Sequence, residues 1–222
     1  MEIIELLRSG GLVMLPLGVF SILAIAFIAE RFYFWRKIEL GQSAAVSQAL
    51  KKYRDDDREA TLKSLERNLY IPIIRVYYAV LELDALTPEE FHLALETEAQ
   101  AELPGLKRFS AYFETVITTS PLLGLLGTVT GLIRSFSSLD LGNIGGSDSL
   151  RVTGGISEAL VSTATGLLVA IVTLIFSNAF RVKYRRQVSE LKEYGGQLEL
   201  IFLRKYTQEE SAKEPITIKD AD

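Results

Sequence analysis

Four side chains between residues 128 and 163 have types and positions that could handle protons or charge inside a membrane. Thr128 lies within the uncharged run 115–133, and Thr163 lies within the uncharged run 159–180. Arg134 directly follows the first of these runs, and Glu158 directly precedes the second. A hydroxyl relays or accepts a hydrogen bond but carries no charge. An ionisable group inside a membrane segment is costly to bury, and is therefore by default a candidate functional group.

The positions along the chain predict two layers. Thr128 lies 11 residues before the predicted end of its span and Thr163 lies 9 residues after Gly154, so both are about 15 Å deep at 1.5 Å per residue. Two hydroxyls at equal depth predict a polar layer near mid-membrane. Arg134 and Glu158 lie shallower and at similar height, which favours an ion pair. A second interpretation stays open, in which Glu158 is a rim carboxylate satisfied by a helix N-terminus and Arg134.

The predicted site also includes three glycines, and it lacks a carboxylate at mid-membrane. Gly124, Gly127 and Gly131 recur at spacings of three and four, which makes a smooth helix face for close helix packing. No carboxylate lies at mid-membrane in any uncharged run. If the chain conducts protons, a partner helix is expected to supply the central acid.

Three membrane-spanning helices are predicted to hold these residues. The first uncharged run, 9–29, has 21 residues and is about 31 Å long as a helix, the thickness of a bilayer core. Hydropathy and interfacial aromatics predict spans over 9–35, 115–139 and 156–180. Turn-forming Gly, Ser, Asn and Asp residues predict a loop over 140–155, so the second and third spans form an antiparallel hairpin.

Basic residues set the predicted orientation, because Lys and Arg near span ends stay in the cytoplasm. They follow the first and third spans and precede the second. The N-terminal segment 1–8 is therefore expected outside, with a cytoplasmic insertion over 36–114 and a cytoplasmic helix and tail over 181–222. The insertion has helical periodicity and a capping box at Thr87 and Glu90 with Pro88 between them. Pro104-Gly105 is a candidate kink or break, and no breaker follows it before the second span, so the helix beyond it is expected to continue into the membrane. The fold class is an all-α membrane protein with long cytoplasmic helical extensions.

The composition excludes several other functions. The chain of 222 residues is 48% hydrophobic with a formal net charge of -4, contains no cysteine, and has one histidine, His92, among helix formers. We therefore expect no metal, no bound cofactor and no nucleic-acid partner. An intramembrane hydrolase is unfavoured, because the spans contain neither a carboxylate pair nor a Ser/His set.

Two segments resemble a known family. "TTSPLLGLLGTVTGLIRSF" (118–136) and "GGISEALVSTATGLLVAI" (154–171) resemble the MotA/TolQ/ExbB proton-channel family, and the three spans favour its ExbB/TolQ-like members. The resemblance implies a multi-pass protein of the bacterial inner membrane, with its N-terminus periplasmic and its C-terminus cytoplasmic. It also implies a homopentameric bundle around a central pore, and protons as the coupling ion.

The same resemblance implies partners and residue roles. An ExbD/TolR-like single-span protein would bring an aspartate into the pore, and a TonB- or TolA-like envelope-spanning protein would receive the work. Thr128 and Thr163 would line the pore around that aspartate, and Glu158 would be the acid of the third span with a gating or coupling role. Arg134 has no counterpart in the pattern. The alternative is a passive membrane scaffold that assembles the partners without lining a proton path.

Overall fold

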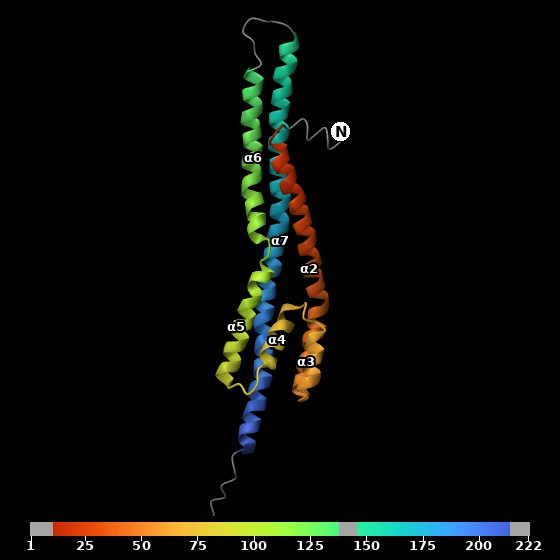
Figure 1. The fold of residues 1–222 in the computed structure, drawn as a ribbon, viewed down its shortest axis with the longest axis vertical. Helices are drawn as coiled ribbons and strands as arrows, with labels where there is room; N and C mark the ends of the chain where they lie inside the picture. The colour runs from red at the N-terminus through yellow and green to blue at the C-terminus, as the bar shows by residue number, and fades with distance from the viewer. Residues whose placement is uncertain (1–10, 138–145, 214–222) are drawn as a thin grey trace, which may run out of the picture. The chain divides into compact units, whose positions relative to one another are not determined.

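The computed structural model describes residues 11–137 and 146–213, with side chains described over 152–212 in the second range. The predicted N-terminal segment 1–8, residues 9–10 and 138–139 of two predicted spans, residues 140–145 of the predicted loop, and the end of the tail, 214–222, lie outside the described residues. The regular structure in the described ranges is α-helical (Figure 1), in the order α2 (Met14–Arg54), α3 (Arg58–Glu66), α4 (Pro72–Glu82), α5 (Pro88–Leu106), α6 (Ser110–Ser137) and α7 (Gly146–Lys213).

Three helical stretches are long and apolar enough to cross a bilayer, in agreement with the three predicted spans. They are Met14–Arg54, Pro88–Ser137 and Val152–Ala212. Each apolar part continues into a polar helical part, as the predicted cytoplasmic extensions require. The chain divides into two compact units, the hairpin unit (Met1–Phe32 and Arg108–Val182) and the extension unit (Tyr33–Lys107 and Lys183–Asp222), so α2 and α7 contribute to both.

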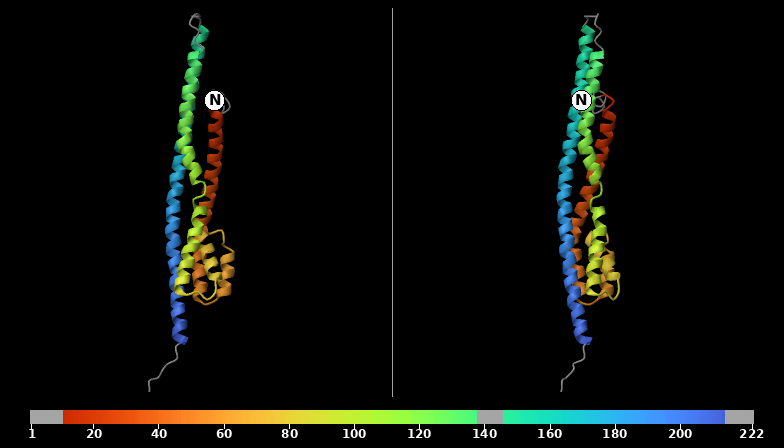
Figure 2. Two further views of the ribbon diagram at one scale, coloured as in Figure 1. Left: turned by 60° about the vertical axis from the view of Figure 1, so that its left-hand side comes forward. Right: turned by 90° about the vertical axis from the view of Figure 1, so that its left-hand side faces the viewer.

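In the hairpin unit, α6 and the first part of α7 run antiparallel and side by side, with the first part of α2 beside them (Figures 1 and 2). The facing surfaces of α6 and α7 consist largely of small residues, and we call this contact the seam. Its buried members on α6 are Val116, Ser120, Gly124, Gly127, Gly131 and Ser135. Opposite them, Ala159, Ser162, Ala170 and Thr173 of α7 are buried. Small side chains let the two backbones approach closely, which stabilises helix pairs in lipid.

The predicted loop 140–155 differs from the structure, because α7 begins at Gly146. Gly154 and Gly155 are therefore helical, and Gly155 has a packing role rather than a turn role. A Cβ built on Gly155 would lie 3.0 Å from the Gly131 carbonyl oxygen and 2.0 Å from Ser135 Oγ. Local propensity indicated a turn, whereas close contact with α6 favours glycine within a helix.

The predicted continuous helix from the insertion into the second span is also interrupted. α5 ends at Leu106 and α6 begins at Ser110, and between them Phe109 has a φ of 66°. A positive φ is unfavourable for a bulky residue, so packing must hold it. The Phe109 ring stacks on Phe27 with centroids 4.1 Å apart, and the Arg31 guanidinium lies 5.6 Å from its centroid.

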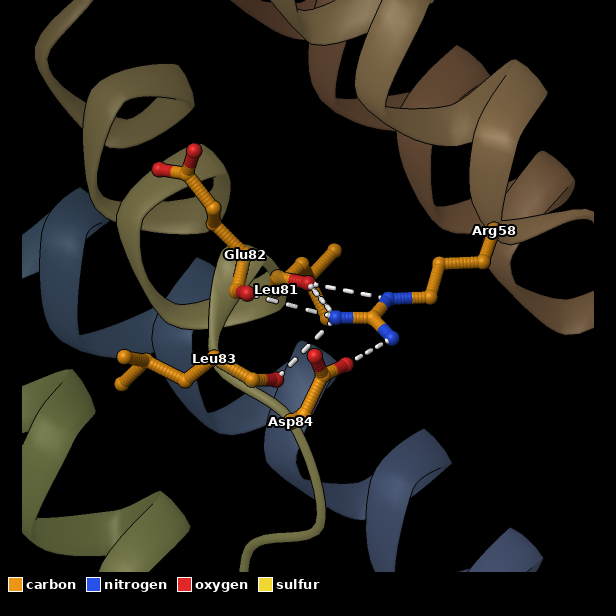
Figure 3. Close-up of polar contacts among 5 residues, drawn as sticks. All are labelled: Arg58, Leu81, Glu82, Leu83 and Asp84. Carbon is orange, nitrogen blue, oxygen red and sulfur yellow. Dashed lines mark hydrogen bonds and ion pairs between the residues drawn. The ribbon is translucent and has the colours of Figure 1, made fainter.

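The extension unit contains the later parts of α2 and α7 with α3, α4 and α5. α4 contacts both α3 and α5 and is its most buried helix. The C-terminus of α4 is capped by Arg58 of α3 (Figure 3). Its guanidinium donates to the carbonyl oxygens of Leu81 (2.9 Å) and Leu83 (3.2 Å) and pairs with Asp84. A cation at a helix C-terminus satisfies carbonyls that have no partner within the helix.

The predicted capping box is confirmed, with Thr87 Oγ1 accepting from the Glu90 N–H and Glu90 Oε2 accepting from the Thr87 N–H. α7 continues through Gly195 and Gly196, where the sequence predicts a weakened helix. Just before them, the buried Tyr77 hydroxyl donates to the Tyr194 carbonyl oxygen over 2.7 Å. This contact ties α4 to α7.

Candidate functional site

The seam positions the candidate residues. A Cβ built on Gly124 would lie 3.0 Å from Thr163 Cα and 3.0 Å from the Ser162 carbonyl oxygen. A Cβ on Gly127 would lie 2.6 Å from Ser162 Cβ, and one on Gly131 would lie 2.9 Å from the Gly155 carbonyl oxygen. The three glycines predicted for helix packing therefore all lie against α7 at distances that leave no room for a side chain.

Thr128 and Thr163 meet across the seam, as their predicted depth requires. Their hydroxyls hydrogen-bond to each other, and both side chains are partly buried. Thr163 Oγ1 also lies 2.9 Å from the Gly124 carbonyl oxygen, and Thr128 Oγ1 lies 3.2 Å from the same oxygen. Each hydroxyl has one proton, so one threonine donates to its neighbour while the neighbour donates to the carbonyl. The pair can therefore reverse its direction of donation.

Arg134 and Glu158 form the predicted ion pair, with Arg134 Nη1 2.8 Å from Glu158 Oε1. We call it the tip-side pair, because it lies toward the α6–α7 connection. The predicted N-terminal position of Glu158 is wrong, since α7 begins 12 residues earlier, at Gly146. The Glu158 carboxylate instead lies beside the start of α2: a Cβ built on Gly11 would be 1.8 Å from Oε1.

Gly11 is a residue that the sequence interpretation missed. Its φ of +70° is in the left-handed region, and Met14 at the start of α2 donates its N–H to the Gly11 carbonyl oxygen over 3.1 Å. Both the backbone angle and the Glu158 contact require glycine here. The available signal was the Gly-Gly pair at 10–11, just inside the first uncharged run.

The site residues lie on two different edges of the seam. Thr163 follows Glu158 by five residues, which rotates it by about 140° around α7 at 100° per residue. Glu158 faces the start of α2. Leu123 of α6 packs against Met14 and Leu17 of α2 and against Val13, which directly precedes α2. We call this side the α2 edge.

The other side, which carries the threonine pair, we call the bare edge. Leu160 and Leu167 lie three residues before and four after Thr163, which places them on its side of α7. They are 65% and 46% exposed, and Leu125, three residues before Thr128, is 57% exposed. The threonine pair therefore lies at the border between the seam and an exposed apolar surface.

A second ion pair across the seam was not predicted. Arg181 Nη2 lies 3.5 Å from Glu114 Oε1 at the opposite end of the hairpin, and we call it the base-side pair. Its signal was present in the sequence. Glu114 immediately precedes the second uncharged run, 115–133, and Arg181 immediately follows the third, 159–180.

Several other hydroxyls of α6 and α7 donate to backbone carbonyl oxygens, whereas the buried Ser120 Oγ in the seam has no hydrogen-bond partner among the described residues. Thr118, Thr165 and Thr173 donate to carbonyl oxygens one turn earlier in their own helices. Ser162 is buried in the seam and donates to the Ala159 carbonyl oxygen over 2.8 Å. The hydroxyl groups that have partners therefore mostly bond to the backbone of their own helix, whereas the hydroxyls of the threonine pair bond to each other across the seam.

No group of three or more His, Asp or Glu residues that could hold a metal ion occurs in the described ranges. His92 lies in the extension unit, where its Nδ1 is 3.0 Å from Glu199 Oε1. The candidate site therefore consists of the threonine pair and the two ion pairs.

Comparison with known proteins places the chain in a family. The sequence profile of the MotA/TolQ/ExbB proton channel family matches residues 46–193, a range that contains both uncharged runs of the hairpin. The chain belongs to this family. It is similar to ExbB-like protein 3 of Synechocystis sp., with 52% identity over 202 residues, covering 91% of this chain and 96% of that protein.

Two further relatives of the ExbB and TolQ types extend the comparison. The biopolymer transport protein ExbB of Helicobacter pylori is 31% identical over 163 residues, covering 73% of this chain and 74% of that protein. The Tol-Pal system protein TolQ of Pseudomonas aeruginosa is 33% identical over 110 residues, covering 50% of this chain and 44% of that protein. Family membership and the three apolar helical stretches make the chain a multi-pass membrane protein. Gly11 lies outside the range that the family profile matches.

Proposed function

We propose that this chain is an ExbB/TolQ-like proton-channel subunit of the bacterial inner membrane. With an ExbD/TolR-like single-span partner it converts the proton motive force into mechanical work on a TonB- or TolA-like envelope-spanning protein, for nutrient import or envelope maintenance. Protons are the coupling ion, and no other cofactor takes part. A proton crossing about 150 mV releases about 3.5 kcal/mol, enough to bias a two-state element.

The observation that carries the proposal is the threonine pair on the bare edge. The Thr128 and Thr163 hydroxyls border an exposed apolar surface on which a single transmembrane helix can pack. The two hydroxyls reverse donation without moving charge, so they can hydrogen-bond a carboxylic acid or a carboxylate on that helix. Copies of this chain, five by the family resemblance, would surround the partner helix with their bare edges.

The proposed topology follows from the basic residues at the span ends, with the N-terminus periplasmic and the C-terminus cytoplasmic. The base-side pair then lies toward the cytoplasm and the tip-side pair toward the periplasm. Glu158 and Arg134 act through α2 in this proposal. They are coupling, gating or assembly residues that fix the start of the first span on the hairpin, because Glu158 lies on the α2 edge.

A passive scaffold is the alternative, and one observation favours it. The threonine hydroxyls also lie within hydrogen-bond distance of the Gly124 carbonyl oxygen, an interaction that packing alone would explain. In this case the chain would hold its partners in the membrane without conducting protons.

Proton flux through the purified complex in liposomes separates the two functions. The complex is reconstituted with a pH-sensitive dye inside, and a potassium gradient with valinomycin sets the potential. Thr163→Val keeps the shape and removes the hydroxyl. We expect it to lower flux about tenfold or more, since positioned proton-transfer groups contribute about 10²–10⁴-fold. Thr163→Ser is the matched control and should retain flux. Normal flux and transport in Thr163→Val and Thr128→Val, with normal assembly, would leave the scaffold as the function.

A further inference from the structure

The charges that close the uncharged runs form two pairs of opposite polarity. On α6 the acid, Glu114, is at the base and the arginine, Arg134, is at the tip, while on α7 the acid, Glu158, is at the tip and Arg181 is at the base. The structure pairs them across the seam at both ends, over 2.8 Å at the tip and 3.5 Å at the base. The proposed function uses the tip-side pair through α2 and leaves the base-side pair without a role.

The base-side pair lies on the edge that carries the threonine pair. Arg181 follows Thr163 by 18 residues, which is five turns of an α-helix, so both side chains leave α7 on the same side. Glu114 precedes Thr128 by 14 residues, just under four turns of α6. The contact of Glu114 with Arg181 therefore repeats the contact of Thr128 with Thr163 farther down the same edge.

The α2 edge is closed at the same level. The Tyr112 hydroxyl, two residues before Glu114, donates to the Phe20 carbonyl oxygen of α2 over 3.2 Å. The Tyr112 ring also packs edge-on against Phe27, with centroids 4.8 Å apart. Aromatic packing against α2 thus fills that side, whereas Glu114 and Arg181 are 62% and 52% exposed on the other.

The distance along the helix places Glu114 at the mouth of the bare edge. Fourteen residues correspond to about 21 Å, whereas half the thickness of a bilayer core is about 15 Å. With the threonine pair at mid-membrane, Glu114 lies just beyond the hydrocarbon and in contact with water. It is the first ionisable group that a proton meets below the threonine pair on α6.

We propose that Glu114 is the proton-exchanging carboxylate at the base-side mouth of the bare edge, held there by Arg181. This inference rests on the proposed proton-channel function. A proton that leaves the threonine level on a water molecule is transferred to Glu114, so that an O–H bond forms on the carboxylate as the bond to that water breaks. The proton then passes to bulk water on the base side, and the carboxylate returns to Arg181. Arg181 is a positioning residue that keeps the acid at the mouth.

The test measures proton flux in the same liposomes with Glu114→Gln, which keeps the shape and removes the exchangeable carboxylate. We expect flux to fall about fivefold or more and assembly, measured by size-exclusion chromatography, to be unchanged. Glu114→Asp should keep most of the flux. Glu39→Gln is the matched control, because Glu39 is also an exposed acid paired with a basic residue, Lys183, but belongs to the extension unit.

A mobile buffer distinguishes proton exchange from structural support. A weak acid at high concentration on the base side carries protons to and from the mouth, so it should restore flux in Glu114→Gln while leaving the wild type unchanged. Flux within twofold of wild type in Glu114→Gln, or a loss that no buffer restores, would overturn the role of Glu114. If Thr163→Val then still abolishes flux, the proposed function stands without this inference. If neither variant affects flux, the proposed function fails.

Discussion

The α2 edge and the bare edge of the hairpin contain the same types of charged residue but have different surroundings. Each carries an arginine–carboxylate pair that joins α6 to α7. On the α2 edge the acid, Glu158, is 21% exposed and lies against Gly11, whereas on the bare edge Glu114 is 62% exposed. The threonine pair lies on the bare edge. Residue type and depth therefore do not determine which ion pair is exposed, because the neighbouring helix α2 covers one edge and leaves the other open.

The seam supports both edges, so a change there should have the largest effect. A Cβ on Gly166 would lie 2.5 Å from the Ser120 carbonyl oxygen, and a backbone atom cannot move aside as a side chain can. We expect Gly166→Ala to separate α6 from α7, to lower stability by about 1–3 kcal/mol as overpacking does, and to abolish flux. Thermal unfolding of the purified complex checks the stability.

Gly154→Ala is the control on the same helix, because nothing lies within 4 Å of a Cβ built there. It should be neutral or stabilising by up to about 1 kcal/mol through helix propensity. An equal loss of stability and flux in both variants would mean that glycine at position 166 is not required for the close approach of α6 and α7.

The sequence was sufficient for the spans, the threonine contact and the tip-side pair. Long uncharged runs, and positions at equal depth in an antiparallel hairpin, can be recognised from the order of residues alone, without knowledge of how the helices pack. The edges could not be predicted in this way. Which side of the seam α2 covers depends on contacts such as the packing of Leu123 against the cluster of Val13, Met14 and Leu17, between residues more than a hundred positions apart.

The helix boundaries that the sequence prediction misplaced are also explained by packing between distant residues. Gly154 and Gly155 indicated a turn by propensity, but contact with Gly131 makes Gly155 part of a packed helix. Conversely, no residue in 107–109 is a strong helix breaker, and the break there coincides with stacking of Phe109 on Phe27. In both places tertiary packing overrides local preference.

On the α2 edge alone, Gly11→Ala should have the next largest effect. The φ of +70° costs about 1–2 kcal/mol for a residue with a Cβ, and the new methyl group displaces the Glu158 carboxylate from Arg134. We expect a lower midpoint of thermal unfolding and easier proteolysis of the N-terminal segment. In a double-mutant cycle with Glu158→Ala, the part caused by the clash should disappear while the backbone strain remains. Full additivity would show that Gly11 and Glu158 do not interact.

Glu158→Gln tests whether the two edges differ in function. The amide keeps the size of the side chain and still accepts a hydrogen bond from Arg134, and the position lies away from the bare edge. We expect flux to fall by about fivefold or less, below the loss of tenfold or more in Thr163→Val, because replacing a hydrogen bond between two charged groups by one to a neutral amide costs about 1 kcal/mol. A loss as large as that of Thr163→Val would place Glu158 in the proton path itself and would remove the functional distinction between the edges.

The smallest effects should come from the two arginines. Both are more than half exposed, at 58% for Arg134 and 52% for Arg181, and exposed ion pairs contribute about 0–1 kcal/mol. Arg134→Gln should nevertheless lower stability more than Arg181→Gln, because its acid is the less exposed one. Salt screens exposed pairs more than partly buried ones, so the difference should persist when thermal unfolding is repeated at high ionic strength. Equal stability of the two variants at low and high salt would mean that α2 does not shield the tip-side pair.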